Sequence, residues 1–391
     1  MSERFINPAV SAVPPSAIRK FFDSASTMKN AISLGVGEPD FVTPFSVRNS
    51  AIDSLLDGET QYTTNYGILP LREEISRYLS ERYQAGYDPH TEVLVTVGAS
   101  EAIDIALRAM LRPGDEVLIP EPCYISYQAC TRFAGGVPVQ VHTHAANDFE
   151  LDAKDLEDCI TPKSKVLILS YPNNPTGAVL PREKLEAVAR VAIKHDLFVI
   201  CDEIYSELAY DGFIQVSMAS LPGMWERTMI ISGFSKAFAM TGFRLGYMAA
   251  PQPYVVAAAK IHQYTIMCAS RQSQVAAYYA LKHGRETGYA DVIRMRESYN
   301  QRRRLMLKAF RDMGLECFEP RGAFYMFPSI KKTGLSSEAF CEKLLQEKAV
   351  ICVPGSAFGD SGEGHIRCCY ATAISKLQEA FERIAAFLKT C

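Results

Sequence analysis

Long apolar runs are missing from this sequence of 391 residues. No stretch of about 18 apolar residues occurs, so we expect no transmembrane helix. The first 22 residues alternate proline, serine and single apolar residues, and therefore lack the apolar core of an export signal. An excess of one charge is also missing, because 41 lysines and arginines nearly balance 44 aspartates and glutamates. The net charge of −3 argues against a nucleic-acid-binding surface and against a basic membrane-binding patch.

Metal-binding and nucleotide-binding motifs are scarce as well. The eleven cysteines include no Cys-x-x-Cys pair and are too sparse for a disulfide scaffold, so we expect reduced, buried thiols in a cytoplasmic protein. His142 and His144 are separated by one residue, but no third ligand is in view and we expect no metal site. No loop of the form G-x-x-x-x-G-K-[ST] occurs. The glycines at 35–37 do not begin a dinucleotide-binding motif, since Pro39 stands where a helix should open.

What the sequence does contain is typical of a large α/β protein. Its hydrophobic fraction of 48% allows a sizeable core, and its length predicts two or three domains. Apolar runs bounded by glycine, proline or aspartate predict buried strands at 93–97, 116–120, 138–141, 165–169, 198–202 and 228–232. Between them, helical patterns cover 100–111, 124–133 and 181–195. Uniformly apolar strands separated by helices indicate a mostly parallel sheet that is covered on both faces.

The pattern changes after about residue 252. The charged segment 286–313 predicts one long helix, on which we expect the basic run 302–304 to form a solvated face. Further helices are predicted over 336–347 and 374–388, with short apolar runs between the helices that predict strands. Strands with helices on one side indicate a smaller α+β domain.

These patterns divide the chain into three parts. We expect an N-terminal segment that packs on the smaller domain, a large α/β domain and a small C-terminal α+β domain, over 1–45, 46–285 and 286–391. No glycine- and serine-rich linker separates the two domains. We therefore expect their boundary within an unbroken helix near 285–290.

The strongest chemical signal is the segment GFSKAFAMTGFRLG, residues 233–246. Lys236 follows a predicted buried strand and has small and apolar neighbours, which predicts that its amine lies in an apolar pocket. Loss of hydration there lowers the pKa of an amine and makes it a nucleophile toward carbonyl groups. Eight residues later, Arg244 supplies a permanent charge with a rigid fork of donors, which suits a phosphate.

Two other predicted strands end in residues suited to ligand binding. Asp202 closes the strand 198–202, so its carboxylate emerges at the edge where parallel sheets bind ligands. Gly98, Ala99 and Ser100 follow another strand and open a helix. Their backbone N–H groups therefore point toward any anion at the helix N-terminus, although many strand-to-helix turns share this pattern.

The segment around Lys236 is similar, position by position, to the pyridoxal-phosphate attachment site of class I aminotransferases. Other landmarks of that family follow in its order: SLGVGEPDF (33–41), YTTNYGILPLREEI (62–75), TVGASEAI (96–103), PEPCYISY (120–127), YPNNPTGAV (171–179), CDEIY (201–205) and HIRCCYAT (365–372). Within the class, the chain most resembles the aspartate, aromatic and N-acetyl-diaminopimelate aminotransferases. The resemblance implies fold type I of the PLP-dependent transferases: a large domain with a mixed seven-stranded sheet, a smaller α+β domain, and a homodimer with active sites at its interface.

The resemblance also implies how pyridoxal 5'-phosphate (PLP) is held. Lys236 would form a Schiff base with the cofactor and shuttle the proton during the reaction. Asp202 would pair with the pyridine nitrogen, while Tyr205 and Asn174 would donate to the phenolic oxygen. Tyr124 would stack on the ring. The phosphate contacts would be Gly98, Ala99, Ser100, Ser235, Arg244 and Tyr62 of the partner subunit.

A substrate site is implied in the same way. Arg367 would clamp the substrate α-carboxylate with its rigid fork, and Gly37 would contact the substrate through its backbone. Tyr124 and Asn174 would also contact the substrate. Ile18 lies where the N-terminal segment is expected to close over the substrate side chain, and its apolar character favours a broad or aromatic amino donor.

We therefore predict an aminotransferase that moves an amino group between an L-amino acid (aromatic, aspartate or a broad range) and a 2-oxo acid such as 2-oxoglutarate. An N-acetyl-diaminopimelate aminotransferase is one alternative. A PLP-dependent C–S β-lyase is another, because such enzymes share the lysine, the aspartate and both arginines, although the match over 60–75 and 171–205 favours transamination. The effector domain of a transcription regulator would need a DNA-binding extension, for which we expect no room ahead of the substrate loop.

Overall fold

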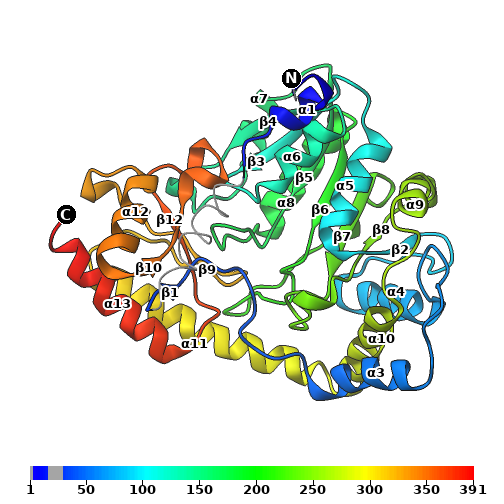
Figure 1. The fold of residues 1–391 in the computed structure, drawn as a ribbon. Coiled ribbons are helices and arrows are strands. Elements are labelled where there is room, and N and C mark those ends of the chain that lie inside the picture. The colour runs from blue at the N-terminus through cyan, green and yellow to red at the C-terminus, as the bar shows by residue number, and fades with distance from the viewer. Residues whose placement is uncertain (1–2, 16–29) are drawn as a thin grey trace.

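The computed structural model describes residues 3–15 and 30–391. Its largest element is a seven-stranded mixed sheet with the order β2-β8-β7-β6-β5-β3-β4 (Figure 1). The strands are β2 (Val93–Thr96), β3 (Glu116–Glu121), β4 (Val137–His142), β5 (Ser164–Leu169), β6 (Phe198–Asp202), β7 (Thr228–Gly233) and β8 (Gly246–Ala249). β8 is antiparallel to both neighbours, and every other pair in this sheet is parallel. The six strands predicted from apolar runs are confirmed.

Helices cover both faces of this sheet. One face is covered by α5 (Gly98–Met110), α6 (Ser126–Phe133) and α9 (Gln252–Thr265), and the other by α4 (Leu69–Tyr83), α8 (Arg182–Lys194) and α10 (Arg271–Glu286). Successive residues of a strand point to opposite faces. In β6, Phe198 and Ile200 accordingly pack with α5 and α9, whereas Val199 and Cys201 pack with α8. Burial on both faces explains why these strands are apolar throughout.

A second group of elements lies to the left in Figure 1. It contains α11 (Ala290–Asp312), α12 (Ser337–Lys348), α13 (Ile374–Leu388), and the antiparallel strands β11 (Val353–Pro354), β12 (Ile366–Cys369) and β9 (Tyr325–Met326). From the beginning of the chain, β1 (Ile32–Ser33) pairs with β10 (Val350–Ile351). The other α-helices of the described residues are α1 (Pro8–Ser11), α3 (Phe45–Leu56) and α7 (Ala153–Asp158).

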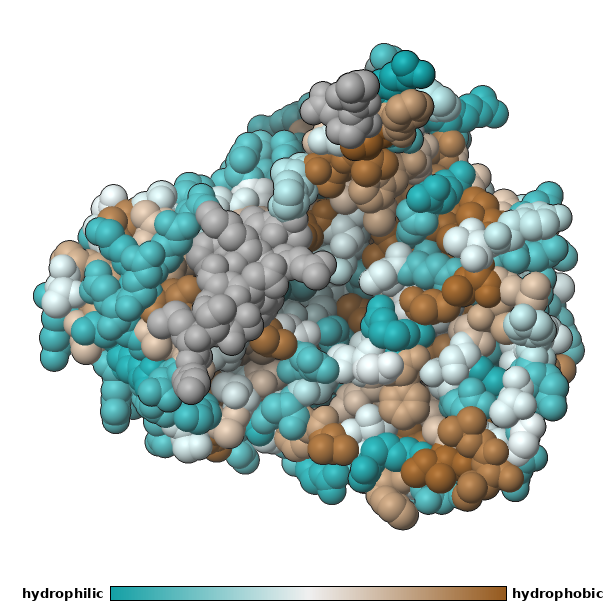
Figure 2. Space-filling view, in the orientation of Figure 1, coloured by the Kyte–Doolittle hydropathy of each residue, from teal (hydrophilic) through white to brown (hydrophobic). Residues whose placement is uncertain are grey.

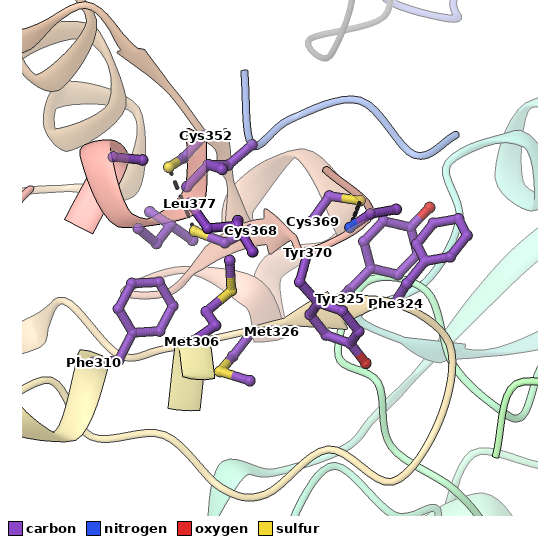
Figure 3. Close-up of a cluster of buried hydrophobic side chains, with 14 of the residues drawn as sticks. Met306, Phe310, Phe324, Tyr325, Met326, Cys352, Cys368, Cys369, Tyr370 and Leu377 are labelled. Atoms are coloured by element: carbon purple, nitrogen blue, oxygen red, sulfur yellow. Dashed lines mark hydrogen bonds between the residues drawn. The ribbon is translucent and has the colours of Figure 1, made fainter. Parts of the chain in front are cut away.

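The core of this second group forms between α11, α13 and the short strands. Figure 3 shows Cys368 pointing toward Cys352, and their sulfur atoms are 3.4 Å apart. The next residue, Cys369, points the opposite way, toward the Tyr325 side of the strand. This alternation is what a strand requires, and it gives β12 one face toward Cys352 and one face toward Tyr325.

Two expectations for this region are wrong. The helix is interrupted between α10 and α11, because Gly288 and Tyr289 adopt left-handed backbone conformations with φ of 63° and 59°. The basic run 302–304 is not a solvated face as a whole either, because Arg302 and Arg303 are buried and Arg304 alone is exposed. Arg303 is fully buried, and it pairs with Asp211 and with Glu319. The division of the chain at residues 45 and 285 stays a prediction. None of the helices in the described part of the chain has the length and apolar character needed to cross a bilayer.

Candidate active site

The carboxyl ends of five strands meet at one edge of the large sheet. β3, β5, β6 and β7 are parallel, and β2 runs with them because both β2 and β7 are antiparallel to β8. Asp202 ends β6, Lys236 follows the end of β7, and Gly98 opens α5 after β2. A cavity of about 600 Å³ lies at this edge. Open α/β sheets bind their ligands at such edges.

Most of the predicted site residues line this cavity. They are Gly37, Ala99, Ser100, Tyr124, Asn174, Asp202, Tyr205, Ser235, Lys236, Arg244 and Arg367. Gly98 lies directly behind the lining, where an added Cβ would come within 2.8 Å of Arg244 Nη2. Tyr62 does not line the cavity of its own chain, and its side chain is 79% exposed. Ile18 lies outside the described residues, so its predicted contact with the substrate stays a prediction.

Lys236 places its amine between the large sheet and the segment that contains Gly37. Its Nζ donates a hydrogen bond to the carbonyl oxygen of Gly37 at 2.6 Å. The same nitrogen lies 5.9 Å from the ring centre of Tyr205 and 5.7 Å from that of Phe324. Burial is the main cause that lowers the pKa of Lys236 to about 8. Much of the amine is therefore neutral and nucleophilic in mildly alkaline solution.

Asp202 lies at the base of the cavity with 5% of its surface exposed. Its Oδ2 accepts a hydrogen bond from the hydroxyl of Tyr127 at 2.7 Å, and its Oδ1 accepts one from the backbone N–H of Ile204 at 3.2 Å. Burial raises the pKa of Asp202, and these two hydrogen bonds act against that rise. The carboxylate is therefore held in place by donors that favour its charged form.

Arg367 reaches the cavity from β12 and is almost completely buried. Its Nη1 donates to Asn174 Oδ1 at 2.8 Å and its Nη2 donates to the carbonyl oxygen of Gly35 at 2.6 Å. Its Nε has no partner among the described residues. The guanidinium group is held between two rings, with its Cζ 4.5 Å from the ring centre of Tyr325 and 4.8 Å from that of Phe358.

Arg244 brings a second guanidinium group to the start of α5. The residue adopts a left-handed conformation with φ 51°, which is uncommon for a residue with a side chain and which other contacts must stabilise. Its Nη1 donates to the carbonyl oxygen of Thr241 at 3.2 Å, and the side chain is otherwise exposed. The N-terminal N–H groups of α5 and this cation together favour an anion at this end of the cavity.

Sequence reasoning missed two tyrosines of this cavity. Tyr127 lies on α6, and Tyr124 precedes that helix by two residues. On the helix predicted over 124–133, their spacing of three residues places both side chains on one face, and this signal could have identified Tyr127. Tyr325 lies on the two-residue strand β9, and its hydroxyl is 2.8 Å from that of Tyr205. No local pattern relates Tyr325 to Tyr205, which precedes it by 120 residues.

The fold and the cavity together define a PLP-dependent transferase of fold type I, and the comparison with known families agrees. The chain belongs to the family described as aminotransferase class I and II, whose model matches residues 29–384. It is a PLP-dependent aminotransferase.

Similar proteins cover almost the whole chain. The protein YugH of Bacillus subtilis is 54% identical over 384 residues, which cover 98% of each chain. Aromatic-amino-acid aminotransferase 2 of Thermococcus litoralis and the aspartate aminotransferase of Pyrococcus abyssi are each 46% identical over 377 residues, or 96% of each chain. The crystal structure of an aromatic aminotransferase from Pyrococcus horikoshii superposes with a TM-score of 0.90 at 44% identity, and the match covers 95% of this chain and 99% of that one.

Proposed function

We propose that the cavity binds PLP and uses it to move an amino group between an L-amino acid and a 2-oxo acid such as 2-oxoglutarate. The observation that carries this proposal is the convergence of Lys236, Asp202, Arg244 and Arg367 on one cavity of about 600 Å³. A buried amine, a buried carboxylate and two guanidinium groups meet there. The volume is typical of a site for a small molecule, and each of the four groups has one counterpart in the cofactor or the substrate.

The donor set fits the polar groups of PLP. Lys236 would bond to the aldehyde carbon, Asp202 would pair with the pyridine nitrogen, and Tyr205 and Asn174 would donate to the phenolic oxygen. Tyr124 supplies a ring for stacking. The counterparts of the phosphate are Gly98, Ala99, Ser100, Ser235 and Arg244. Because a side chain at residue 98 would reach Arg244, glycine there keeps the anion site open. When bound, PLP withdraws electrons from the substrate and stabilises negative charge at its Cα.

The substrate would be oriented by Arg367 and Gly37. The guanidinium group of Arg367 is buried and has an Nε without a partner among the described residues, which suits a bidentate contact with an α-carboxylate. Gly37 exposes its backbone next to Lys236, and its carbonyl oxygen accepts a hydrogen bond from the Lys236 amine. Because the pKa of Lys236 is lowered to about 8, its amine can take a proton from the substrate Cα and return it to another atom.

The charges of the lining favour an amino donor without a second carboxylate. Lys236, Arg244 and Arg367 are the cations among the described lining residues, and each already has a counterpart in the cofactor or the α-carboxylate. Glu38 adds a negative charge to the same lining. We therefore propose an aromatic or broad donor range, and an N-acetyl-diaminopimelate donor stays an alternative. The relatives do not decide between donors, since their names include aromatic and aspartate aminotransferases.

The proposal is tested by reducing the purified protein with borohydride and mapping the cofactor adduct. We expect the adduct on Lys236, and we expect Lys236→Ala to retain weak cofactor binding but lose turnover. Lys308→Ala is a matched control, because that lysine is 74% exposed on α11 and outside the cavity. A panel of amino and 2-oxo acids under single turnover then identifies the donor. Ammonia and pyruvate as products would instead indicate β-elimination, and an adduct on another lysine would contradict the site.

We propose in addition that the protein is a homodimer whose active sites each use both chains. An apolar patch supports this, and Figure 2 shows it at the lower right, over α3. Its exposed side chains are Phe45, Ile52, Leu55 and Leu56, with exposures of 73%, 53%, 54% and 79%. Tyr62 follows this helix and is exposed outside the cavity of its own chain, which leaves it free to contact the phosphate of a partner. Obligate interfaces typically bury more than about 2,000 Å².

Complementation between two impaired variants tests the shared site. Tyr62→Phe and Lys236→Ala chains are mixed and allowed to exchange, after the Tyr62→Phe homodimer has been found impaired. A mixed dimer would contain one intact site and one site with both defects. Random exchange should therefore restore about a quarter of the wild-type activity, because half of the dimers have one intact site of two. No recovery despite exchange would assign Tyr62 to its own chain.

We propose a cytoplasmic location on the basis of the thiols. All eleven cysteines are free, and only Cys391 is exposed. Buried free thiols are typical of proteins in reducing compartments. Fractionation of cells with an antibody against the protein tests this location.

A further inference from the structure

Tyr325 touches two of the proposed functional groups and has no role so far. The side chain is 1% exposed and lines the cavity. Its hydroxyl is 2.8 Å from the hydroxyl of Tyr205, and its ring lies under the guanidinium group of Arg367, 4.5 Å from Cζ. The residue therefore connects the proposed contact with the cofactor oxygen to the proposed clamp for the substrate carboxylate.

The position of the Tyr325 hydroxyl is fixed from several sides. A Cβ added at Gly37 would lie 2.2 Å from this oxygen, so the hydroxyl rests directly against the backbone of Gly37. The ring packs edge-on against Phe324 with a centroid distance of 4.9 Å, and the two rings lie together in Figure 3. Tyr205 packs edge-on against both rings, with centroid distances of 5.8 Å to Tyr325 and 5.4 Å to Phe324. A ring held in this way presents its oxygen to Tyr205 in one orientation.

We propose that Tyr325 is a positioning residue that acts through Tyr205 on the cofactor and through Arg367 on the substrate. The inference rests on the proposed function. Each tyrosine has one hydroxyl hydrogen. If Tyr205 gives its hydrogen to the phenolic oxygen of the cofactor, the hydrogen in the bond between the two tyrosines must come from Tyr325. The Tyr325 hydroxyl then fixes the rotation of the Tyr205 hydroxyl and polarises it, which strengthens its donation.

Four charged or titratable groups surround Tyr325. They are Tyr205, Arg367, Cys369 and Tyr124. Burial keeps the pKa of Tyr325 well above its ordinary value, so the hydroxyl retains its hydrogen at any pH at which the enzyme works. The face of the same ring attracts the guanidinium group of Arg367 and holds it in the plane from which it would meet a carboxylate.

Two substitutions separate the hydroxyl from the ring. Tyr325→Phe removes the hydroxyl and keeps the ring under Arg367, whereas Tyr325→Leu removes both. Tyr87→Phe is the matched control, because Tyr87 is buried, has a hydroxyl without a partner among the described residues, stacks on Trp225 and does not line the cavity. Each holoenzyme is titrated by cofactor absorbance in the absence of substrate, and KM for the amino donor is measured separately.

Hydrogen bonds to the phenolic oxygen draw charge away from the neighbouring nitrogen that links the cofactor to Lys236, and they lower its pKa. We expect Tyr325→Phe to raise the pKa of this nitrogen, as read from the absorbance, by about half a unit. The reason is that Tyr205, which donates to the phenolic oxygen, loses the hydrogen bond from Tyr325. Its KM should stay within about twofold of wild type, because the contact with Arg367 remains. Tyr325→Leu should show the same shift and a KM about fivefold higher. The control should match wild type in both measurements.

The outcomes distinguish the inference from the function on which it rests. An absorbance titration of Tyr325→Phe that coincides with wild type overturns the action through Tyr205. An unchanged KM in Tyr325→Leu overturns the action through Arg367. A wild-type protein whose cofactor is not attached to Lys236 overturns the proposed function itself, and this is recognised before any variant is compared.

Discussion

The two sides of the cavity are built in different ways. The sheet wall, which we define by Asn174, Asp202 and Lys236, follows the carboxyl ends of parallel strands in one seven-stranded sheet. The crossing wall, which we define by Gly37, Tyr325 and Arg367, comes from segments near both ends of the chain (Figure 1). Its strands are shorter, and β1 and β9 have two residues each. One wall is fixed by the pairing of longer strands in the large sheet, and the other by short paired strands together with side-chain contacts.

The contacts of the segment after β1 illustrate the second kind of construction. Asp40 accepts two hydrogen bonds from Arg302 Nη1 on α11, at 2.7 and 2.8 Å, and Arg302 is 8% exposed. Thr43 donates to the carbonyl oxygen of Ala239, close to Lys236 in the chain. Such contacts can rearrange without breaking a sheet. We conclude that the sheet wall is suited to hold the cofactor and the crossing wall to recognise the substrate.

The largest expected effect tests the sheet wall. Asp202→Asn should lower kcat on the order of a thousandfold, because it removes the charge that keeps the pyridine nitrogen protonated. Cofactor content should change little, since the phosphate contacts remain. Glu203→Gln is the control: Glu203 is the next residue, is equally buried and lies outside the cavity, and burial raises its pKa to about 7. A rate for Asp202→Asn close to that of the control would make Asp202 a structural residue.

Substitutions in the crossing wall should change KM for the substrate more than kcat. Arg367→Leu should reduce kcat/KM about a hundredfold, mostly through KM, because the α-carboxylate loses its buried partner. The absorbance of the resting holoenzyme should remain close to wild type. Arg304→Leu serves as a control, since that side chain is 66% exposed on α11. Loss of the cofactor from Arg367→Leu would mean that the two walls are not separate in function.

The sheet wall could be predicted from the sequence to a greater extent than the crossing wall. The strand at 198–202 and the glycine that follows β2 are readable from local patterns, because apolar runs and turn residues mark each strand end. Parallel pairing then brings these ends to one edge, so the sheet wall follows from physical reasoning. The lowered pKa of Lys236 was predicted on the same ground, and burial is indeed its main cause.

The crossing wall was not predictable in that way. Nothing near Arg367 indicates that it would meet Asn174, which precedes it by 193 residues, and only the resemblance to a family predicted that it faces the site. The prediction that Arg303 is solvated was wrong for the same reason. Its partners, Asp211 and Glu319, lie outside its own helix, so the local pattern of a basic run predicted solvent where the structure has burial.

A smaller effect should follow from the hydroxyl of Tyr127, which lines the cavity beside Asp202. Tyr127→Phe should lower kcat about tenfold, because Asp202 loses one hydrogen bond to its charged form and its pKa rises further. In an Asp202→Asn background, the same substitution should have little additional effect. Tyr171→Phe is the control, since its buried hydroxyl donates to Phe149 at 2.8 Å away from the cavity lining. Additive effects in the double variant would mean that Tyr127 does not act through Asp202.

The smallest expected effect concerns the amine that lies between the walls. Only neutral Lys236 can attack the aldehyde of PLP, and burial lowers its pKa from 10.5 to about 8. The amine is protonated below that value and neutral above it, so capture of PLP by the apoprotein should accelerate with rising pH. The rate should increase about fivefold from pH 7 to pH 8 and level off above pH 9. Stopped-flow absorbance measures this capture, with N-acetyl-lysine methylamide as a reference for an unburied amine. In Glu38→Gln the midpoint of this pH–rate curve should move to lower pH, because Glu38 raises the pKa of Lys236. A midpoint close to that of the reference amine would mean that the two walls do not exclude water from Lys236.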